Sequence, residues 1–398
     1  MAGTAVTPGT PRVLRAMNDR TALELLVTHG PLTRTRLGEL TGLSKPTASQ
    51  LLARLEAAGL VRATGTAPGG PGPAARLYGI VPAAAHVVAL AVDQEGITAA
   101  VADITGRVLG ERRVPAPADG PPTVCRAAAS VREAVAEAGL GPGDIHRAVI
   151  GMPGALDPRT GELRYAPHLS GWQSATLRAD LAGALGTPVV VENDVNLAAV
   201  AERQGGAARD VEDFVLVWVD DGVGAAVVLG GRPLRGFTGG AGEIGYMPLP
   251  GAPLARGGPR GRRRTRQGAA ASSGWWAGAA VRELARAHGI EAPTAAEAVA
   301  GALRTPGAGD RVLDELAGRL ATGLAAVVSV VDPELVVLSG RTARAGGERL
   351  RERVAAGLTG LALPAPRLRL SAVDGPPVLA GALCTALAAA RDAVFDTA

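Results

Sequence analysis

The segment VDDGVGAAVVLGG, at residues 219–231, is a glycine-containing turn that leads into a short apolar strand. Gly222 and Gly224 would let backbone N–H groups approach an anion closely, as they do in phosphate-binding loops. Two carboxylates, Asp220 and Asp221, stand at the mouth of this turn. Two like charges about 4 Å apart cost ~4 kcal/mol at an effective dielectric near 20, so the turn has the wrong charge for a phosphate. We expect the two glycines to serve only the backbone geometry of the turn.

A second set of polar side chains lies on one face of the segment SKPTASQLLARLEAAGL, which begins at residue 44. Ser44 is a candidate helix N-cap and a candidate DNA contact. On the same face, Lys45 and Gln50 could reach base edges in DNA. Thr47 and Arg54 could reach phosphates. The opposite face is apolar at helical spacing, with Ala48, Leu51, Leu52 and Leu55.

The elements around this face predict a winged helix–turn–helix over residues 1–80. TALELLVTHG carries a Thr21-x-x-Glu24 capping box and predicts one helix. PLTRTRLGELTG predicts a second helix with Thr33 as its N-cap, which ends in a glycine turn at Gly42. The polar-faced helix follows directly. Two short strands then flank a Gly/Pro-rich tip, with Arg62 and Arg76 on the arms of this wing. The pattern predicts binding to double-stranded DNA; a helical packing domain without nucleic acid is the alternative.

Composition sets bounds on the protein class. A chain of 398 residues with 47% hydrophobic residues can form two to three domains with ample core. It has no run of eighteen uninterrupted apolar residues and no signal-peptide pattern, so we expect no membrane partner. Cys125 and Cys384 are its two cysteines, which fits a reducing cytoplasm without disulfides. The net charge of +4 is too modest to indicate nucleic-acid binding by itself.

From about residue 81 the pattern changes to strands that alternate with helices. HVVALAVD, GITAAVAD and GRVLGERRVPA predict three adjacent strands, and HRAVIGMPG and TPVVVEND predict buried strands. A similar order begins again at DFVLVWVDD and GAAVVLGG. Two such halves predict an α/β chain with two similar lobes, residues 81–200 and 201–398, and a cleft between them. We expect the final helix, PVLAGALCTALAAARDAVF, to pack back on the first lobe.

Five motifs in this region resemble the ROK family of bacterial repressors, open reading frames and sugar kinases. They are IGMPGALD (150–157), APHLSGW (166–172), VENDVNLAAVAE (191–202), GGAGEIGYMPL (239–249) and VDPELVVLSG (331–340). The resemblance covers the whole chain and implies a two-lobed actin-like (RNase H-like) ATPase fold behind the winged helix. Family members with a winged helix in front are generally transcription regulators, so the resemblance implies a regulator.

In ROK kinases the Asp of a Glu-Asn-Asp motif is the general base that deprotonates a sugar hydroxyl. The matching residue is Asp194, preceded by Glu192 and Asn193. The kinases also hold the donor phosphate with two Gly/Thr loops. The first, Asp-x-Gly-Gly-Thr, is here VDQEGI with Gln94 and Glu95, and the second, Gly-Thr-Gly-x-Gly, is here DDGVGAA. With both loops altered we predict no kinase activity; the alternative is a hexose kinase that acts through Asp194 and carries an appended DNA-binding head.

ROK proteins commonly hold a structural zinc with the His of Gly-Glu-Ile-Gly-His and three nearby cysteines. Here the motif reads GEIGY, with Tyr246 in place of the His, and no cysteine lies between Cys125 and Cys384. Zinc prefers four N/S ligands at close quarters, so we predict no metal and no cofactor. An Arg/Gly-rich segment, LARGGPRGRRRTRQGAAASSG, stands in place of the cysteines. A solvated loop is favoured there over a contact with DNA or an acidic partner.

Asn193, Asp194 and Glu243 match family positions that hydrogen-bond sugar hydroxyls, a task that acid and amide groups suit. Tyr246 replaces a His contact and His168 stands where Asn is expected, so these residues could instead line the cleft without a ligand. We expect a neutral or amino sugar rather than a phosphosugar, because the cleft motifs show carboxylates and no lysine or arginine. The prediction is a cytoplasmic, sugar-responsive regulator that binds its operator as a homodimer or homotetramer.

Overall fold

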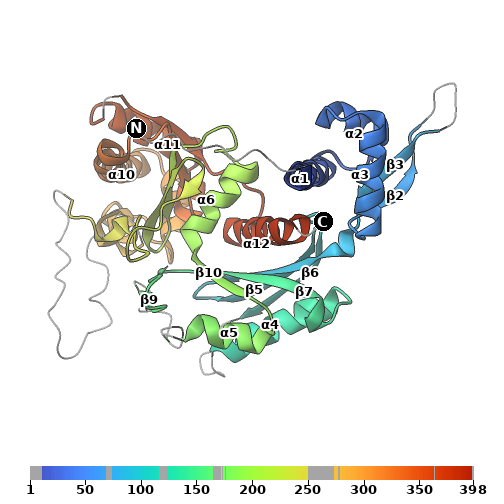
Figure 1. The fold of residues 1–398 in the computed structure, drawn as a ribbon. Helices are drawn as coiled ribbons and strands as arrows, with labels where there is room; N and C mark the ends of the chain where they lie inside the picture. Colours follow the sequence, from blue (N-terminus) through green and yellow to red (C-terminus); the bar gives the residue numbers. More distant parts are fainter. Residues whose placement is uncertain are drawn as a thin grey trace, which may run out of the picture.

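The structure is a computed structural model that describes residues 11–396 except 69–73, 116–122, 165–171, 173, 175, 250–272, 277 and 363. It contains a small N-terminal domain with a three-stranded sheet, followed by two five-stranded sheets with helices around them (Figure 1). The predicted fold class, a winged helix–turn–helix followed by a two-lobed α/β region, is confirmed.

The N-terminal domain has the predicted order of elements. It comprises α1 (Pro11–His29), β1 (Leu32–Thr33), α2 (Arg34–Thr41), α3 (Lys45–Ala57), β2 (Val61–Thr66) and β3 (Arg76–Ile80). Thr33 caps α2, where its side chain accepts a hydrogen bond from Arg36 N at 3.2 Å. Gly42 ends α2 in the left-handed region at φ 69°, which favours glycine. The four apolar residues predicted for the inner face of α3 are all buried.

The first helix departs from the prediction, because α1 begins at Pro11 and runs through the expected capping box. Thr21 lies inside the helix and its hydroxyl donates to the Met17 carbonyl at 2.8 Å. Glu24 accepts from Arg20 instead of from an N-terminal N–H group. A threonine can make this bond to the preceding turn anywhere in a helix, so the Thr-x-x-Glu pattern did not mark the start.

The first lobe is built on a mixed sheet of order β10-β7-β4-β5-β6. Its strands are β4 (His86–Val92), β5 (Gly96–Asp103), β6 (Val108–Pro115), β7 (Ile145–Met152) and β10 (Val189–Asn193). The three predicted adjacent strands form an antiparallel β4-β5-β6 meander, and β7 and β10 are parallel to β4. Helices α4 (Thr123–Glu137) and α5 (Leu177–Leu185) lie below this sheet in Figure 1. A short hairpin, β8 (Ala155–Leu156) and β9 (Leu163–Arg164), follows β7.

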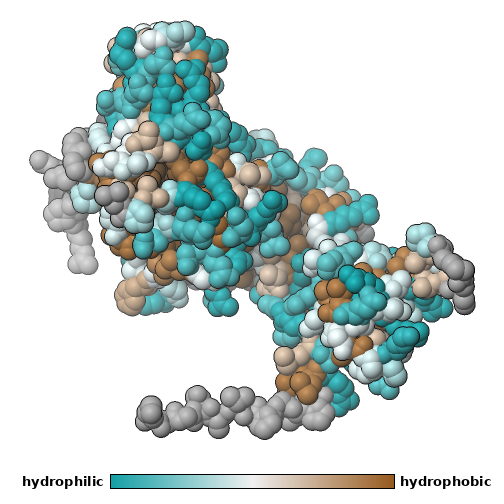
Figure 2. Space-filling view, turned by 90° about the horizontal axis from the view of Figure 1, so that it is seen from above, coloured by the Kyte–Doolittle hydropathy of each residue, from teal (hydrophilic) through white to brown (hydrophobic). Residues whose placement is uncertain are grey.

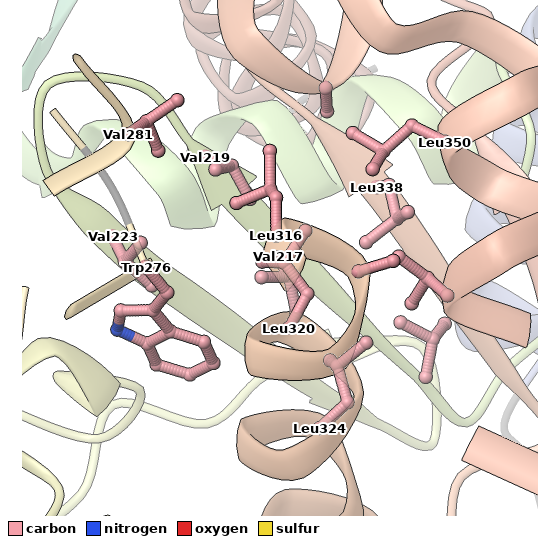
Figure 3. Packing of buried hydrophobic residues seen from close by; sticks show 14 of the residues in the cluster. Val217, Val219, Val223, Trp276, Val281, Leu316, Leu320, Leu324, Leu338 and Leu350 are labelled. Carbon is pink, nitrogen blue, oxygen red and sulfur yellow. The ribbon is translucent and has the colours of Figure 1, made fainter. Parts of the chain in front are cut away.

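The second lobe repeats the arrangement with the sheet order β13-β12-β11-β14-β15. Its strands are β11 (Phe214–Val219), β12 (Val223–Leu229), β13 (Arg232–Pro233), β14 (Leu335–Ser339) and β15 (Arg367–Leu370). Its helices are α7 (Ser273–Trp276), α8 (Ala279–Ala287), α9 (Ala295–Arg304), α10 (Ala308–Val331) and α11 (Arg341–Thr359). Figure 3 shows the core that they share, where Trp276 lies beside leucines of α10. A Cβ at Gly323 would lie 1.8 Å from the Trp276 ring, so the indole packs directly on the α10 backbone.

Two helices, α6 (Asp194–Gly205) and α12 (Pro377–Phe395), lie between the two sheets (Figure 1). α6 contributes Val195 and Ala198 to the core of the second sheet, whereas α12 contributes Leu379 to that of the first. The two helices touch backbone to backbone, because a Cβ at Gly381 would lie 1.8 Å from the Leu197 carbonyl oxygen. A movement of α6 therefore has to move α12 or break this contact.

The winged-helix domain is mounted on the end of α12. Phe395 of α12 and Ile104, just after β5, are buried in the core of that domain. Arg20 of α1 forms ion pairs with Asp392 and, at 3.1 Å, with Asp396. In Figure 2 the domain projects to the lower right of the two-lobed body, and much of its visible surface is hydrophilic.

α12 is also, by length and composition, apolar enough to cross a membrane. Its contacts with the first sheet and with α6 are those of a core helix. Among the described helices it alone passes that test.

Candidate functional site

The first half of α3 presents the predicted polar face to solvent. Ser44 caps the helix and accepts from Thr47 N at 3.4 Å, and the two hydroxyl oxygens lie 2.8 Å apart. The side chains of Lys45, Thr47 and Gln50 are exposed beside this cap. Exposed hydroxyl, amide and ammonium groups together suit contacts with phosphates and base edges.

Further cations lie around this face. Arg34, at the start of α2, donates to Ser49 Oγ on α3 at 3.2 Å, and the α3 pattern alone could not have indicated it. Arg62 on β2 and Arg76 on β3 are both exposed on the arms of the wing. The tip between these arms lies outside the described residues. A phosphate contact by the wing arginines stays a prediction.

Arg54 has a partner inside the protein. Its guanidinium donates to Asp19 on α1 through Nη2 at 2.6 Å and through Nε at 3.2 Å. The Asp19 side chain is 4% exposed and that of Arg54 40% exposed. This ion pair holds α3 against α1, so Arg54 helps to fix the orientation of α3. Its predicted phosphate contact is not tested by this geometry.

The structure brings Asp194 and Glu243 together from segments far apart in the chain. Asp194 begins α6, and its carboxylate accepts from Val195 N at 2.8 Å. Burial raises the pKa of Asp194 to about 6. Burial, with a smaller contribution from the charge of Asp194, raises the pKa of Glu243 to about 7. The site therefore holds two carboxyl groups that can donate or accept hydrogen bonds near neutral pH.

Glu243 is positioned by the glycines that precede it. Gly242 has a φ of 88°, and a Cβ there would lie 1.9 Å from the Ala225 carbonyl oxygen. Ala225 N donates to Gly242 O at 2.8 Å, which fixes the loop on β12. Only glycine combines this conformation with this approach, so the glycines of GGAGEIGY place the carboxylate.

Asn193 serves mainly as the N-cap of α6. Its Oδ1 accepts from Val195 N at 2.9 Å and from Asn196 N at 3.0 Å. Its Nδ2 donates to the Gly154 carbonyl oxygen at 2.9 Å. With both acceptor positions used, at most one amide N–H remains for a ligand.

A buried Glu192 adds an interaction that the motif reading missed. Its Oε1 accepts from Asn193 N and from Asn196 Nδ2, both at 2.9 Å. Its Oε2 pairs with Arg235, at 2.7 Å from Nε and 2.6 Å from Nη2. The cleft motifs themselves contain no arginine, and Arg235 reaches Glu192 from beyond β13, outside any motif.

The two altered phosphate loops are joined by one arginine. Arg341, the first residue of α11, donates from Nε to both Asp220 oxygens, at 3.0 and 2.9 Å. Its Nη1 lies 3.2 Å from Glu95 Oε1 and its Nη2 lies 3.4 Å from Asp221 Oδ2. In the first loop, Asp93 Oδ1 accepts from the backbone N–H groups of residues 95 and 96 at 2.8 Å each. Both loops thus use their polar groups within the protein.

The glycines of the second loop do not serve the expected purpose. Neither Gly222 nor Gly224 has a positive φ, so neither conformation requires glycine. A Cβ at Gly224 would lie 3.2 Å from Val195 Cγ2, whereas one at Gly222 would meet open space. Close packing of β12 on α6 therefore explains Gly224, and nothing in the structure explains Gly222.

A match to the ROK family model spans residues 87–363, which is more than half of the chain. The chain belongs to the ROK family. A second match, to the MarR family model, covers residues 17–70 and agrees with a winged helix–turn–helix in front of the ROK region. The actin-like fold implied by the five motifs is confirmed by this assignment and by the solved structures below.

Several known proteins resemble this ROK protein. A ROK hexokinase from Thermus thermophilus is 31% identical over 77% of this chain and 99% of its own, with a TM-score of 0.63. A ROK family transcriptional regulator, described as a homologue of the E. coli MLC protein, covers 97% of this chain and 100% of its own with a TM-score of 0.73. At 20% identity this second likeness shows the fold alone. The E. coli DNA-binding transcriptional dual regulator NagC is 24% identical over 61% of this chain and 59% of its own. The chain spans about three fifths of the length of NagC and of a putative xylose repressor from Caldicellulosiruptor, and 37% of that of a bifunctional NanE/NanK enzyme from Brucella suis.

Tyr246, which replaces the metal-binding His of the family motif, lies in a short 3-10 helix and is 41% exposed. Across the described ranges, no three His, Cys, Asp or Glu side chains converge as a metal site. The Arg/Gly-rich loop 256–266, His168 and most of the motif at 166–172 lie outside the described residues. The absence of zinc stays a prediction.

Proposed function

We propose that this ROK protein is a DNA-binding transcription regulator that responds to a sugar and does not phosphorylate it. The observation that carries the proposal is the exposed polar face of α3 on a winged helix mounted, through α12, on a ROK domain. Two similarities support it: the fold of the MLC homologue covers 97% of this chain, and the relative NagC is described as a DNA-binding transcriptional regulator.

In this proposal α3 enters the major groove of double-stranded DNA. Lys45 and Gln50 read base edges, while the hydroxyls of Ser44 and Thr47 bind a phosphate. The wing arginines, Arg62 and Arg76, bind the backbone beside the groove. Arg54 acts through Asp19, by holding α3 at its angle to α1.

One winged helix reads one half-site, so the proposal requires at least two copies of the chain. A homodimer or homotetramer on a two-fold operator would place two α3 helices a helical turn of DNA apart. The protein would act in the cytoplasm, where its DNA target lies.

The proposed effector is a neutral or amino sugar held by Asp194 and Glu243, with Asn193 as a minor contact. Partly protonated carboxyls both donate and accept, which suits hydroxyl groups. The positive charge of Arg235 is already matched by Glu192, so it offers a phosphate little. Binding between the lobes would move α6, and its contact with α12 would carry the movement to α1. A coupling of about 1–3 kcal/mol changes operator affinity about 5–150-fold.

DNA binding is tested by mobility shift of genomic promoter fragments with the full chain. We expect Gln50→Ala to relax base preference, and Arg62→Ala to weaken all sequences alike and to lower the salt slope by about 1. Arg286→Ala, an exposed arginine on α8, is the control for net charge and should bind as wild type. A protein lacking residues 1–80 that binds the operator as tightly as the full chain would refute the assignment.

The sugar is tested by thermal shift and mobility shift with a panel of neutral, amino and phosphorylated sugars. We expect a neutral or amino sugar to raise the melting temperature of wild type and to change operator affinity, and Glu243→Ala to abolish both responses. The exposed Glu291→Ala serves as the matched control. No response to any sugar, or equal responses of wild type and Glu243→Ala, would show that Asp194 and Glu243 hold no sugar effector.

A hexose kinase with an appended DNA-binding head is the second candidate. Asp194 favours it, because a carboxylate with a pKa of about 6 is a competent general base, and the hexokinase from Thermus thermophilus is a relative. The carboxylates Glu95, Asp220 and Asp221 oppose it. We expect no ATP-dependent phosphorylation of any hexose. Turnover that disappears in Asp194→Asn would establish the kinase instead.

A further inference from the structure

The ion pairs of Arg341 cross from one lobe to the other. Asp220 and Asp221 lie in the turn between β11 and β12, and Arg341 starts α11, so all three belong to the second lobe. Glu95 lies in the turn between β4 and β5 of the first lobe, 246 positions away from Arg341 in the chain. We name these four residues the interlobe bridge.

Both ends of the bridge are held by their own lobe. Gly340, just before Arg341, has a φ of 92°, and a Cβ there would lie 2.4 Å from Val219 O, so the start of α11 is seated on β11. Asp220 has a side chain only 16% exposed and accepts from Nε with both oxygens. On the other side, Arg113 of β6 donates to Glu95 Oε2 at 3.0 Å, which leaves Oε1 to accept from Arg341.

The bridge lies next to the candidate effector site, which is formed by Asp194 and Glu243. Gly224, which follows the Asp220–Asp221 turn, packs against Val195, the neighbour of Asp194. Opening of the lobes would separate Glu95 from the other three bridge residues, whereas the α6–α12 contact could stay intact.

We propose that Arg341 is an interlobe latch, which holds the β4–β5 turn of the first lobe against the β11–β12 turn of the second and limits the opening of the cleft. The three carboxylates outnumber the arginine, so a phosphate chain would have to displace like charges to enter. Glu95, Asp221 and Arg341 are more than half exposed, so salt weakens their pairing.

The test measures the distance between the lobes by pulsed electron spin resonance on the full chain without DNA or sugar. Spin labels at Glu137→Cys on α4 and Arg311→Cys on α10 report on the two lobes, in a Cys125→Ser, Cys384→Ala background. We expect Arg341→Gln and Glu95→Gln each to add a longer and broader distance population. We also expect 1 M NaCl to broaden the distribution of wild type but not to broaden that of Arg341→Gln further.

Arg349→Gln is the matched control. Arg349 lies on the same helix, is 55% exposed against 56% for Arg341, and pairs at 3.1 Å with Asp310 within the second lobe. It should leave the distribution of wild type unchanged. The latch is refuted if Arg341→Gln and Glu95→Gln keep the wild-type distribution, if Arg349→Gln broadens it equally, or if salt leaves wild type unchanged. Should Arg341→Gln not fold, Glu95→Gln decides in the same way. DNA and sugar play no part in this measurement, so its outcome is independent of the proposed function.

Discussion

Replacement of Arg54 by Met should loosen the recognition helix without removing a DNA contact. Breaking a fully buried ion pair costs about 3–5 kcal/mol, because the remaining charge is left unpaired. Asp19 is 4% exposed, but Arg54 is 40% exposed, so water already solvates part of the guanidinium half of the pair and the cost falls to about 2 kcal/mol. Methionine keeps the apolar stem of the side chain, which confines the change to the charge.

The assay is hydrogen exchange of α1 and α3 amides in the full chain. A loss of about 2 kcal/mol predicts exchange about 30-fold faster in these helices. The double variant Asp19→Ala, Arg54→Met should recover part of this loss, because it leaves no buried charge. Arg36→Met is the control, because Arg36 and Glu39 form an exposed pair within α2. It should change the free energy of opening measured by exchange by less than about 0.5 kcal/mol.

Two results would contradict this reasoning. Wild-type exchange in Arg54→Met would show that the pair does not hold α3. Arg54→Met could instead lower the salt slope of operator binding by about 0.9 and leave hydrogen exchange unchanged. That result would show that Arg54 contacts a phosphate.

Three further predictions concern the ROK domain. The pKa of Glu243 is raised to about 7 in the folded state. Between about pH 4.5 and 7 the folded state therefore keeps a proton that the unfolded chain has released. As the pH rises through this range, this group lowers the free energy of unfolding. Glu243→Gln should therefore lose less stability than wild type in urea titrations between pH 5 and 8, by about 1–3 kcal/mol, while Glu291→Gln should follow wild type. Gly381→Ala would force a Cβ onto the α6 backbone and should lower the free energy of unfolding by about 3 kcal/mol. The control Gly318→Ala, in open space on α10, should be neutral or slightly stabilising. A small effect at both sites would contradict the close approach of α12 to α6. Metal analysis should find no stoichiometric zinc, and a full equivalent that survives dialysis would contradict the ligand count around Tyr246.

Local signals predicted the winged helix well because each acts within a few residues. The caps at Thr33 and Ser44 and the apolar spacing of α3 all describe one turn or one face of a helix. The failure at Thr21 has the same origin: a threonine and a glutamate three apart are compatible with a helix interior as well as with its start. A Thr-x-x-Glu pattern marks the start of a helix only where the residues before it are not themselves helical.

The candidate effector site was predicted only in part. Motif resemblance indicated Asp194 and Glu243, and the structure brings them into one electrostatic environment. It could not indicate that the Asn193 amide also donates to the Gly154 carbonyl oxygen, since that contact joins residues 39 positions apart and depends on the fold. Nor could it indicate Arg235, which follows β13 and meets Glu192 across 43 positions of chain.

The sequence by itself determined the kinds of element and their order, because helix and strand periodicity and capping are properties of neighbouring residues. It also indicated the lost charge pattern of the two phosphate loops, at Glu95 and at Asp220–Asp221. Only the tertiary structure decided what these carboxylates do now. Arg341 meets Glu95 across 246 positions of chain, and a pairing of that range follows from how the two lobes are stacked on α6 and α12. Ion pairs have no sequence period, so only the completed fold reveals them.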